Sequence, residues 1–430
     1  MITMIVKQKK PKISKVTVAE AAEQIDGSYL EAFLGGISAA FEQEEDIQMM
    51  RFADFFTCAF SDLAAYQFPW VKLFRKKPLS KNVDVKPIRH ISGDVYKISV
   101  DWINLRSPEA LSFFLLWSLD SILDDLRSKF TMAKCKHYNA ARSSQLTHAK
   151  YSQRTVKDAI IKGCAINFKI FGAFDRCSQL DLVAKFVGLA MVLRRKPDAL
   201  ISVLPKLREN TKYQGQFKLL VITWMVAQAS VGDLSVGLYA WSRILLPIVV
   251  GESGNPQSRD LVLQLVEKIL STPEARPVLV NGAVRRGEQL IPPPAFETLI
   301  HVTFPSSHRV KIDVRVLLAT ERFALMYPIL REVALGGSPG SEAIQQIFSS
   351  AIEAAGKEKV YQYNIVGSVA VLKKISDDLE VQATKLSPYE PLRKILKHFR
   401  KKNKKALATE TDAAHHAHFK DADKYCKIIA

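Results

Sequence analysis

The most constraining feature of this chain is a run of apolar blocks of helix length between residues 195 and 304. Short stretches of Pro, Gly and Asn separate the blocks, as at Gly232 and Asp233 between residues 217–230 and 234–250. Helices joined by such short connections pack as antiparallel neighbours. Strand signals are confined to residues 278–280 and 312–318. The sequence therefore predicts an all-α fold, an irregular α-solenoid-like stack of antiparallel helices of the HEAT or armadillo kind.

Charge and composition predict five segments along the chain. Basic residues concentrate in a head, a linker and a tail, and the remaining helices are expected to be near neutral. Because nucleic-acid-binding folds usually carry their charge on a structured face, this distribution favours attachment to another anionic surface. The expected segments are a basic N-terminal arm (1–15), an N-terminal helical block (16–129), a poorly ordered basic linker (130–180), a central helical scaffold (181–384) and a basic amphipathic helix with a tail (385–430).

The cysteines and the apolar runs bear on the compartment of the protein. Five widely spaced cysteines without a Cys-x-x-Cys pair argue against a disulfide framework and favour a reducing environment. The longest uncharged run, residues 219–232, is shorter than the roughly 20 residues that a membrane-spanning helix needs. We therefore expect buried core helices and no membrane span.

Several helix starts are legible in the sequence. Thr17 with Glu20, and Ser28 with Glu31, have the spacing of a capping box, in which side chains satisfy backbone groups of the first turn. Ser107 precedes a proline that is well placed at a first helical position. These signals predict helices that begin just after Thr17, Ser28 and Ser107.

Motifs of catalysis or phosphate binding are not recognisable. Gly35-Gly36 and the glycines of residues 336–340 lack the spacing of a phosphate loop, and we interpret them as a helix interruption and an interhelical turn. Asp120 and Asp124 lie one turn apart, but they have no His or Lys partner in local register, which indicates a polar helix edge.

A His-rich segment near the C-terminus contains metal-ligand residue types. His415, His416 and His418 match neither the spacing of a zinc finger nor that of a metalloprotease, so the segment is interpreted as a solvated tail. Together with the missing motifs, this interpretation predicts a protein that is not an enzyme, holds no metal or cofactor and takes no small-molecule substrate.

One amphipathic segment is the candidate site for a membrane or a protein partner. Leu392, Ile395, Leu396 and Phe399 form an apolar stripe on a helix expected to begin near Ser387. Such a helix can lie in a membrane interface or bind a partner. Alternatively, the stripe docks on the last scaffold helices and leaves the bases in water. The bases that surround and extend the stripe are Arg393, Lys394, Lys397, Arg400, Lys401, Lys402, Lys404 and Lys405.

A series of short phrases spans nearly the whole chain. These are QFPWVKLF (67–74), VDWIN (100–104), RRKPDAL (194–200), LREN (207–210), KYQGQ (212–216), GDLSVGLY (232–239), NPQSRD (255–260), VNGAVRRG (280–287), LIPPP (290–294) and DADKYCK (421–427). In this order they resemble the plant branch of the transmembrane protein 214 family. The resemblance implies a helical, non-enzymatic protein of the endoplasmic reticulum membrane. Animal members of that family are linked to cell-death signalling under stress in this organelle.

Taken together, these observations predict a scaffold or adaptor at the cytosolic face of the endoplasmic reticulum membrane. It is expected to bind partner proteins and an anionic membrane surface. The competing hypothesis is an RNA-binding α-solenoid, which needs aromatic residues interleaved with bases for stacking on nucleotides. Phe130, Tyr138, Tyr151 and Phe168 are few for that purpose, so nucleic acid is the less favoured partner.

Overall fold

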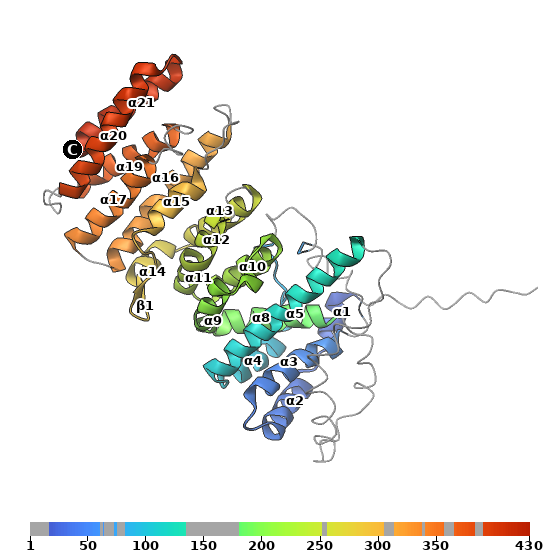
Figure 1. Ribbon diagram of the computed structural model, residues 1–430. Coiled ribbons are helices and arrows are strands. Elements are labelled where there is room, and N and C mark those ends of the chain that lie inside the picture. The colour runs from blue at the N-terminus through green and yellow to red at the C-terminus, as the bar shows by residue number, and fades with distance from the viewer. Residues whose placement is uncertain are drawn as a thin grey trace, which may run out of the picture. The chain divides into compact units, whose positions relative to one another are not determined.

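A computed structural model describes residues 17–60, 63, 73–74, 82–134, 180–251, 256–304, 314–337, 340–356, 365–382 and 390–430. These residues are helical apart from turns, connecting segments and one short hairpin (Figure 1). The predicted all-α class is confirmed. The predicted arm at residues 1–15 lies outside the described residues, as do residues 135–179 of the predicted linker.

The chain folds into two compact units, which are residues 1–76 with 86–195, and residues 77–85 with 196–430. Residues 181–195, which the sequence placed in the central scaffold, therefore belong to the first unit. The helices of the first unit are α1 (Val18–Glu23), α2 (Gly27–Ala40), α3 (Glu45–Ala59), α4 (Gly93–Asn104), α5 (Pro108–Lys134) and α8 (Leu180–Arg195).

Aromatic side chains build the core of the first unit. The rings of Phe52 on α3 and Trp102 on α4 stack with centroids 5.5 Å apart, and both residues are buried. On α8, Gly188 lets the ring of Phe114 approach so closely that a Cβ atom would come within 2.9 Å of it. The first unit therefore closes around α3, α5 and α8.

Most elements of the second unit are helices. They are α9 (Asp198–Glu209), the 3-10 helix η5 (Thr211–Tyr213), α10 (Gln216–Gly232), α11 (Leu234–Ala240), the π-helical turn η6 (Trp241–Leu245), α12 (Leu246–Gly251), α13 (Pro256–Leu270), α14 (Ala275–Asn281), α15 (Ala295–Thr303), α16 (Val314–Gly337), α17 (Ser341–Gly356), α19 (Ile365–Gln382), α20 (Glu390–Thr409) and α21 (Ala413–Ile429), with the strands β1 (Val284–Arg285) and β2 (Glu288–Gln289).

Helices of the second unit pack mainly on helices close to them in sequence. Helix α10 contacts α11 and α13, α13 contacts α16, α16 and α17 contact α19, and α21 packs on both α19 and α20. Such neighbour-to-neighbour contacts are what a helical stack requires. The solenoid interpretation stays a prediction.

Helix α10, which has a single charged residue, is buried over most of its length inside the second unit. Val221, Ile222, Trp224 and Met225 are completely inaccessible to solvent. No helix within the described ranges combines the length and the apolar character needed to cross a bilayer. Residues 219–229 of the uncharged run thus pack as the core helix that the sequence predicted, whereas Val231 and Gly232 at its end are exposed.

A turn at residues 82–85 joins the second unit through its contacts with α10. The carbonyl oxygen of Val85 accepts hydrogen bonds from Trp224 Nε1 at 3.1 Å and from Gln228 Nε2 at 3.2 Å, both on α10. Val83 and Val85 are buried as well. Two buried donors and two apolar side chains hold this segment against α10.

The predicted strands are wrong. Residues 278–280 lie in α14, and residues 314–318 begin α16. The strands that do form, β1 and β2, enclose a two-residue turn in which Arg286 and Gly287 both have positive φ, 51° and 77°. A hairpin turn with two positive φ angles favours glycine, which Gly287 supplies. Sequence periodicity did not predict this hairpin because each of its strands has only two residues.

Predicted helix ends are confirmed at three places and wrong at two. Thr17 forms its capping box with Glu20, and Ser107 Oγ accepts from Ala110 N at 3.2 Å. The predicted break at residues 336–340 is confirmed, since α16 ends at Gly337 and α17 begins at Ser341. Helix α2, however, is capped by Asp26 rather than Ser28, and it continues through Gly35 without interruption. Asp26 is the cap because its carboxylate accepts a hydrogen bond from the backbone nitrogen of Ser28, two residues further along the chain, at 2.8 Å.

Candidate binding surface on the C-terminal helices

The predicted amphipathic helix exists as α20 (Glu390–Thr409). Its predicted start near Ser387 lies outside the described residues, which resume at Glu390. Leu392, Leu396 and Phe399 are 7%, 1% and 2% exposed, and Ile395 is half-buried. The chain itself therefore covers the apolar stripe, which is the second of the two alternatives that the sequence left open.

Two contacts fix α20 against its neighbours α17 and α21. Phe399 lies on Gly356, the last residue of α17, where an added Cβ atom would come within 2.9 Å of the ring. The fully buried side chain of Asn403 donates from Nδ2 to the carbonyl oxygen of Phe419 on α21, at 2.8 Å. Because a buried amide without a partner is costly, this bond ties α20 to α21 in one register.

Helix α21 replaces the solvated tail that the sequence predicted, so that interpretation is wrong. Asp412 caps it by accepting from the backbone nitrogen of Ala414 at 2.8 Å. Its buried positions recur at helical spacing, a signal that the polar His-rich start of the segment obscured. They are Phe419, Ala422, Cys426 and Ile429. Burial raises the pKa of Cys426 to about 12, so this thiol stays protonated.

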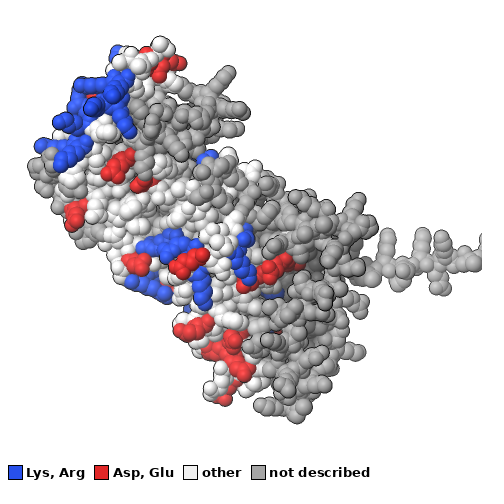
Figure 2. Space-filling model, viewed as in Figure 1, with Lys and Arg blue, Asp and Glu red and all other residues white. Residues whose placement is uncertain are grey.

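The bases of α20 divide into an exposed set and a half-buried pair. Lys402 and Arg400 are half-buried. Arg400, which was expected to face outward, instead donates from Nε to Asp423 Oδ1 at 3.2 Å. Figure 2 shows Lys and Arg side chains gathered over the end of the second unit that contains α20 and α21. The exposed set, which we call the basic face of α20, is Arg393, Lys394, Lys397, Lys401, Lys404 and Lys405.

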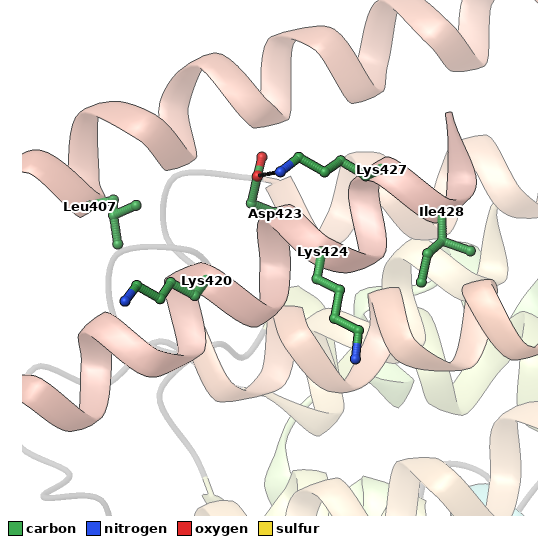
Figure 3. Close-up of a pocket in the computed structure, with 6 residues that line it drawn as sticks. All are labelled: Leu407, Lys420, Asp423, Lys424, Lys427 and Ile428. Carbon is green, nitrogen blue, oxygen red and sulfur yellow. Dashed lines mark ion pairs between the residues drawn. The ribbon is translucent and has the colours of Figure 1, made fainter.

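Helix α21 contributes three further bases that sequence reasoning missed. Lys420, Lys424 and Lys427 are exposed and follow one another at steps of four and three residues. With Leu407, Asp423 and Ile428 they line a shallow depression of about 470 Å³ (Figure 3). Their spacing of four and three residues would have placed them on one side of a helix, but the segment was interpreted as a tail and not as a helix.

Asp423 is the acidic centre of this arrangement. Besides Arg400 it accepts from Lys427 Nζ at 2.8 Å. These hydrogen bonds, first that of Lys427 and then that of Arg400, lower the pKa of Asp423 below its usual value. The carboxylate is therefore ionised at neutral pH, and two cations compensate its charge.

Elsewhere the structure brings together polar groups from separate helices, which their spacing in the sequence did not predict. Asp120 and Asp124 have no His or Lys partner in local register on α5. On the neighbouring helix α8, Lys185 is 1% exposed and packs against α5. Its ammonium group donates to Ser121 Oγ at 2.6 Å and lies 4.8 Å from the centre of the Trp117 ring. Within the described ranges, His, Cys, Asp and Glu do not gather in threes as metal ligands would. The strongest candidate surface remains that of α20 and α21.

Comparison with known proteins shows a distant similarity. The chain is 26% identical over 188 residues to Transmembrane protein 214-A of Xenopus laevis, a match that covers 43% of this chain and 25% of that protein. Transmembrane protein 214-B of the same organism is 24% identical over 188 residues, with the same coverage. The match thus spans about a quarter of the length of these relatives. Neither a family model nor a solved structure matches the chain.

Proposed function

We propose that this protein is a non-enzymatic helical scaffold that attaches to an anionic membrane surface through the basic face of α20. One observation carries the proposal: Leu396 and Phe399 are 1% and 2% exposed, whereas Lys397 and Lys401 on the same helix are exposed. The apolar side of the helix is already occupied by the chain itself. The exposed bases of α20 are therefore the groups that remain available to a partner.

The number of exposed bases makes such an attachment energetically sufficient. Each Lys or Arg near an anionic leaflet contributes about 1 kcal/mol, and the basic face of α20 has six of them. Because counterions screen exposed charges, the attachment weakens as the salt concentration rises. We therefore propose a peripheral, salt-sensitive attachment in which α20 stays folded on the scaffold.

The relatives and the sequence phrases support a location. The similar Xenopus proteins are named as transmembrane proteins, and the phrases of this chain resemble the plant branch of that family. We propose the cytosolic face of the endoplasmic reticulum membrane, with partner proteins bound there by the scaffold. Proximity labelling in cells identifies such partners, and a carbonate wash of membranes distinguishes peripheral from integral attachment.

Single-stranded RNA fits the basic face less well. Binding to RNA without sequence preference uses aromatic side chains on which bases stack. The only aromatic ring of Phe, Tyr or Trp type in α20 is that of Phe399, which is buried. The described face therefore offers charge without a stacking platform.

Flotation on vesicles tests the attachment. We expect the chain to float with vesicles that contain phosphatidylserine and not with vesicles of phosphatidylcholine alone. Replacing Lys394, Lys397, Lys401 and Lys404 by Glu should abolish the flotation, and Arg400 is spared because it pairs with Asp423.

A matched control carries the same change of charge on other exposed bases. These are Lys86, Arg89, Lys97 and Lys206, each replaced by Glu. The control should float like the unmodified chain. Equal loss in both variants, or tight binding of total RNA in a gel shift without any flotation, contradicts the proposal.

A further inference from the structure

The hydroxyl groups of Thr409 and Thr411 are exposed where α20 is connected to α21 (Figure 1). We propose that Thr409 is a phosphorylation site for an acid-directed protein kinase, and that its phosphorylation releases the chain from an anionic membrane. The inference rests on the proposed function and deepens it, because it assigns a regulation to the basic face of α20.

Thr409 continues a row of bases along the outside of α20. Lys397, Lys401 and Lys405 are exposed and follow one another at steps of four residues, and Thr409 is the next position of that row. Residues four apart are neighbours on a helix surface. The Thr409 hydroxyl lies 3.3 Å from the carbonyl oxygen of Lys405 and 3.1 Å from that of Ala406, and it donates back to its own helix. A group attached to this hydroxyl is therefore added at the edge of the basic face.

The acids that follow Thr409 have the spacing that an acid-directed kinase selects. Glu410 comes directly after Thr409, and Asp412 comes three residues after it. The substrate groove of such a kinase contains bases that pair with acids at these positions. Within the described ranges, other exposed Ser or Thr residues share only the second of these acids, and none of them lies on α20. They are Thr17, Ser28 and Ser271.

The place of Thr409 in the fold makes it accessible to a kinase. It is the last residue of α20, and α21 begins at Ala413. Residues 410–412 are not helical, and Thr409 and Asp412 are both exposed. Because helix ends fray, a kinase reaches the hydroxyl by unwinding one turn and without unfolding the scaffold.

The modification is a phosphoryl transfer from ATP. The hydroxyl oxygen of Thr409 forms a bond to the γ-phosphorus, and the bond from that phosphorus to the oxygen of the leaving ADP breaks. The hydroxyl proton passes to the catalytic base of the kinase. The resulting phosphate monoester carries a charge of about −1.5 to −2 at neutral pH.

This charge opposes the attachment of α20 to a membrane. The basic face of α20 has six exposed bases, and one phosphate offsets about two of them. We therefore expect binding to anionic vesicles to weaken about tenfold or more. Leu396 and Phe399, which fix the helix on the scaffold, are buried and are not changed by the modification.

Phosphorylation of the full chain in vitro provides the test. Casein kinase 2 with ATP is the probe, and mass spectrometry locates the phosphate. We expect phosphate on Thr409, about tenfold or more weaker binding to phosphatidylserine vesicles, and recovery of binding after treatment with a phosphatase. Thr409→Val should stay bound after treatment with the kinase. Thr411→Val is the matched control, since Thr411 has Ala414 rather than an acid three residues on, and it should still be released.

A second pair of variants distinguishes the place of the charge from its sign. Thr409→Glu should weaken binding to the vesicles several-fold, whereas Ser271→Glu adds the same charge at another exposed position and should bind like the unmodified chain. Both should keep their melting temperature because both side chains are exposed. Equal weakening in the two variants overturns the regulation through α20.

The outcomes separate this inference from the proposed function. Absence of phosphate from Thr409, or unchanged binding of the phosphorylated chain, overturns the inference while attachment through α20 stands. A melting temperature that falls sharply on phosphorylation also overturns it, because release would then follow from unfolding. An unmodified chain that does not float overturns the proposed function and the release together, whereas phosphate found on Thr409 would still support the site.

Discussion

Helices α10 and α20 are of similar length but use apolar residues in opposite ways. Helix α10 contains one charged residue, Lys218, and its apolar side chains from Leu219 to Ala229 are buried on all sides of the helix. Helix α20 contains eight bases, and only one narrow stripe of it is buried. A helix that is apolar on all sides becomes part of a core, whereas a stripe leaves a face free. The comparison teaches that the position of apolar residues, more than their number, decides which helix remains available to partners.

The largest expected effect comes from the core helix. Trp224 is fully buried on α10 and donates to the Val85 carbonyl. Trp224→Ala should lower the free energy of unfolding by about 3–5 kcal/mol, measured by urea denaturation, because it removes a large side chain from a packed core. The Trp224→Phe control keeps most of the volume and should cost less. An alanine variant as stable as the unmodified chain would show that α10 is not a core helix.

A smaller and more local effect is expected on the inner face of α20. Phe399→Ala should cost about 3 kcal/mol, since the ring fills the space above Gly356. Hydrogen exchange should show the amides of α20 and α21 losing protection while those of α10 keep theirs. Uniform loss of protection would mean that the C-terminal helices and the core unfold as one cooperative unit.

The contact between α20 and α21 should also depend on pH. The pKa of Asp423 is lowered in the folded chain, so its ionised form stabilises the fold above the unfolded-state pKa of about 4. This contribution is lost as the pH falls through the lowered pKa. Asp423→Asn should therefore lower the melting temperature at neutral pH and have no such effect in strong acid. A difference from the unmodified chain that persists in strong acid would point to a packing defect instead.

The smallest effect on stability is expected on the outer face of α20. Lys394, Lys397, Lys401 and Lys404 are exposed, so their replacement by Glu should change the free energy of unfolding by no more than about 0.5 kcal/mol. Thermal unfolding measures this on the same variant that loses flotation. A large loss of stability would mean that the bases serve the fold, and the contrast between the two faces of α20 would disappear.

Local sequence signals were reliable at most places where one turn of chain contains the whole interaction, with Ser28 as an exception because Asp26 caps α2 instead. The capping box of Thr17 and the cap of Ser107 each join residues three apart. The apolar stripe of α20 was read from periodicity in the same way. Helix α21 shows the limit of this approach, because the polar start at His415 outweighed the apolar spacing that begins at Phe419.

Averaged charge concealed a difference between the ends of the chain. The helices outside the basic segments were expected to be near neutral, yet residues 18–59, from the start of α1 to the end of α3, contain nine acidic residues and one base, Arg51. Bases elsewhere in the chain compensated these acids in the average. Charge is therefore better counted over one helix than over a predicted segment.

The sequence by itself determined the all-α class and the two faces of α20, because helical periodicity and capping depend on residues a few positions apart. Only the tertiary structure decided that α17 and α21 cover the apolar face, that Arg400 pairs with Asp423, and that Lys185 lies against α5. Each of these contacts joins residues distant in sequence or on separate helices. Their free energy depends on which surfaces meet, and no local pattern specifies that.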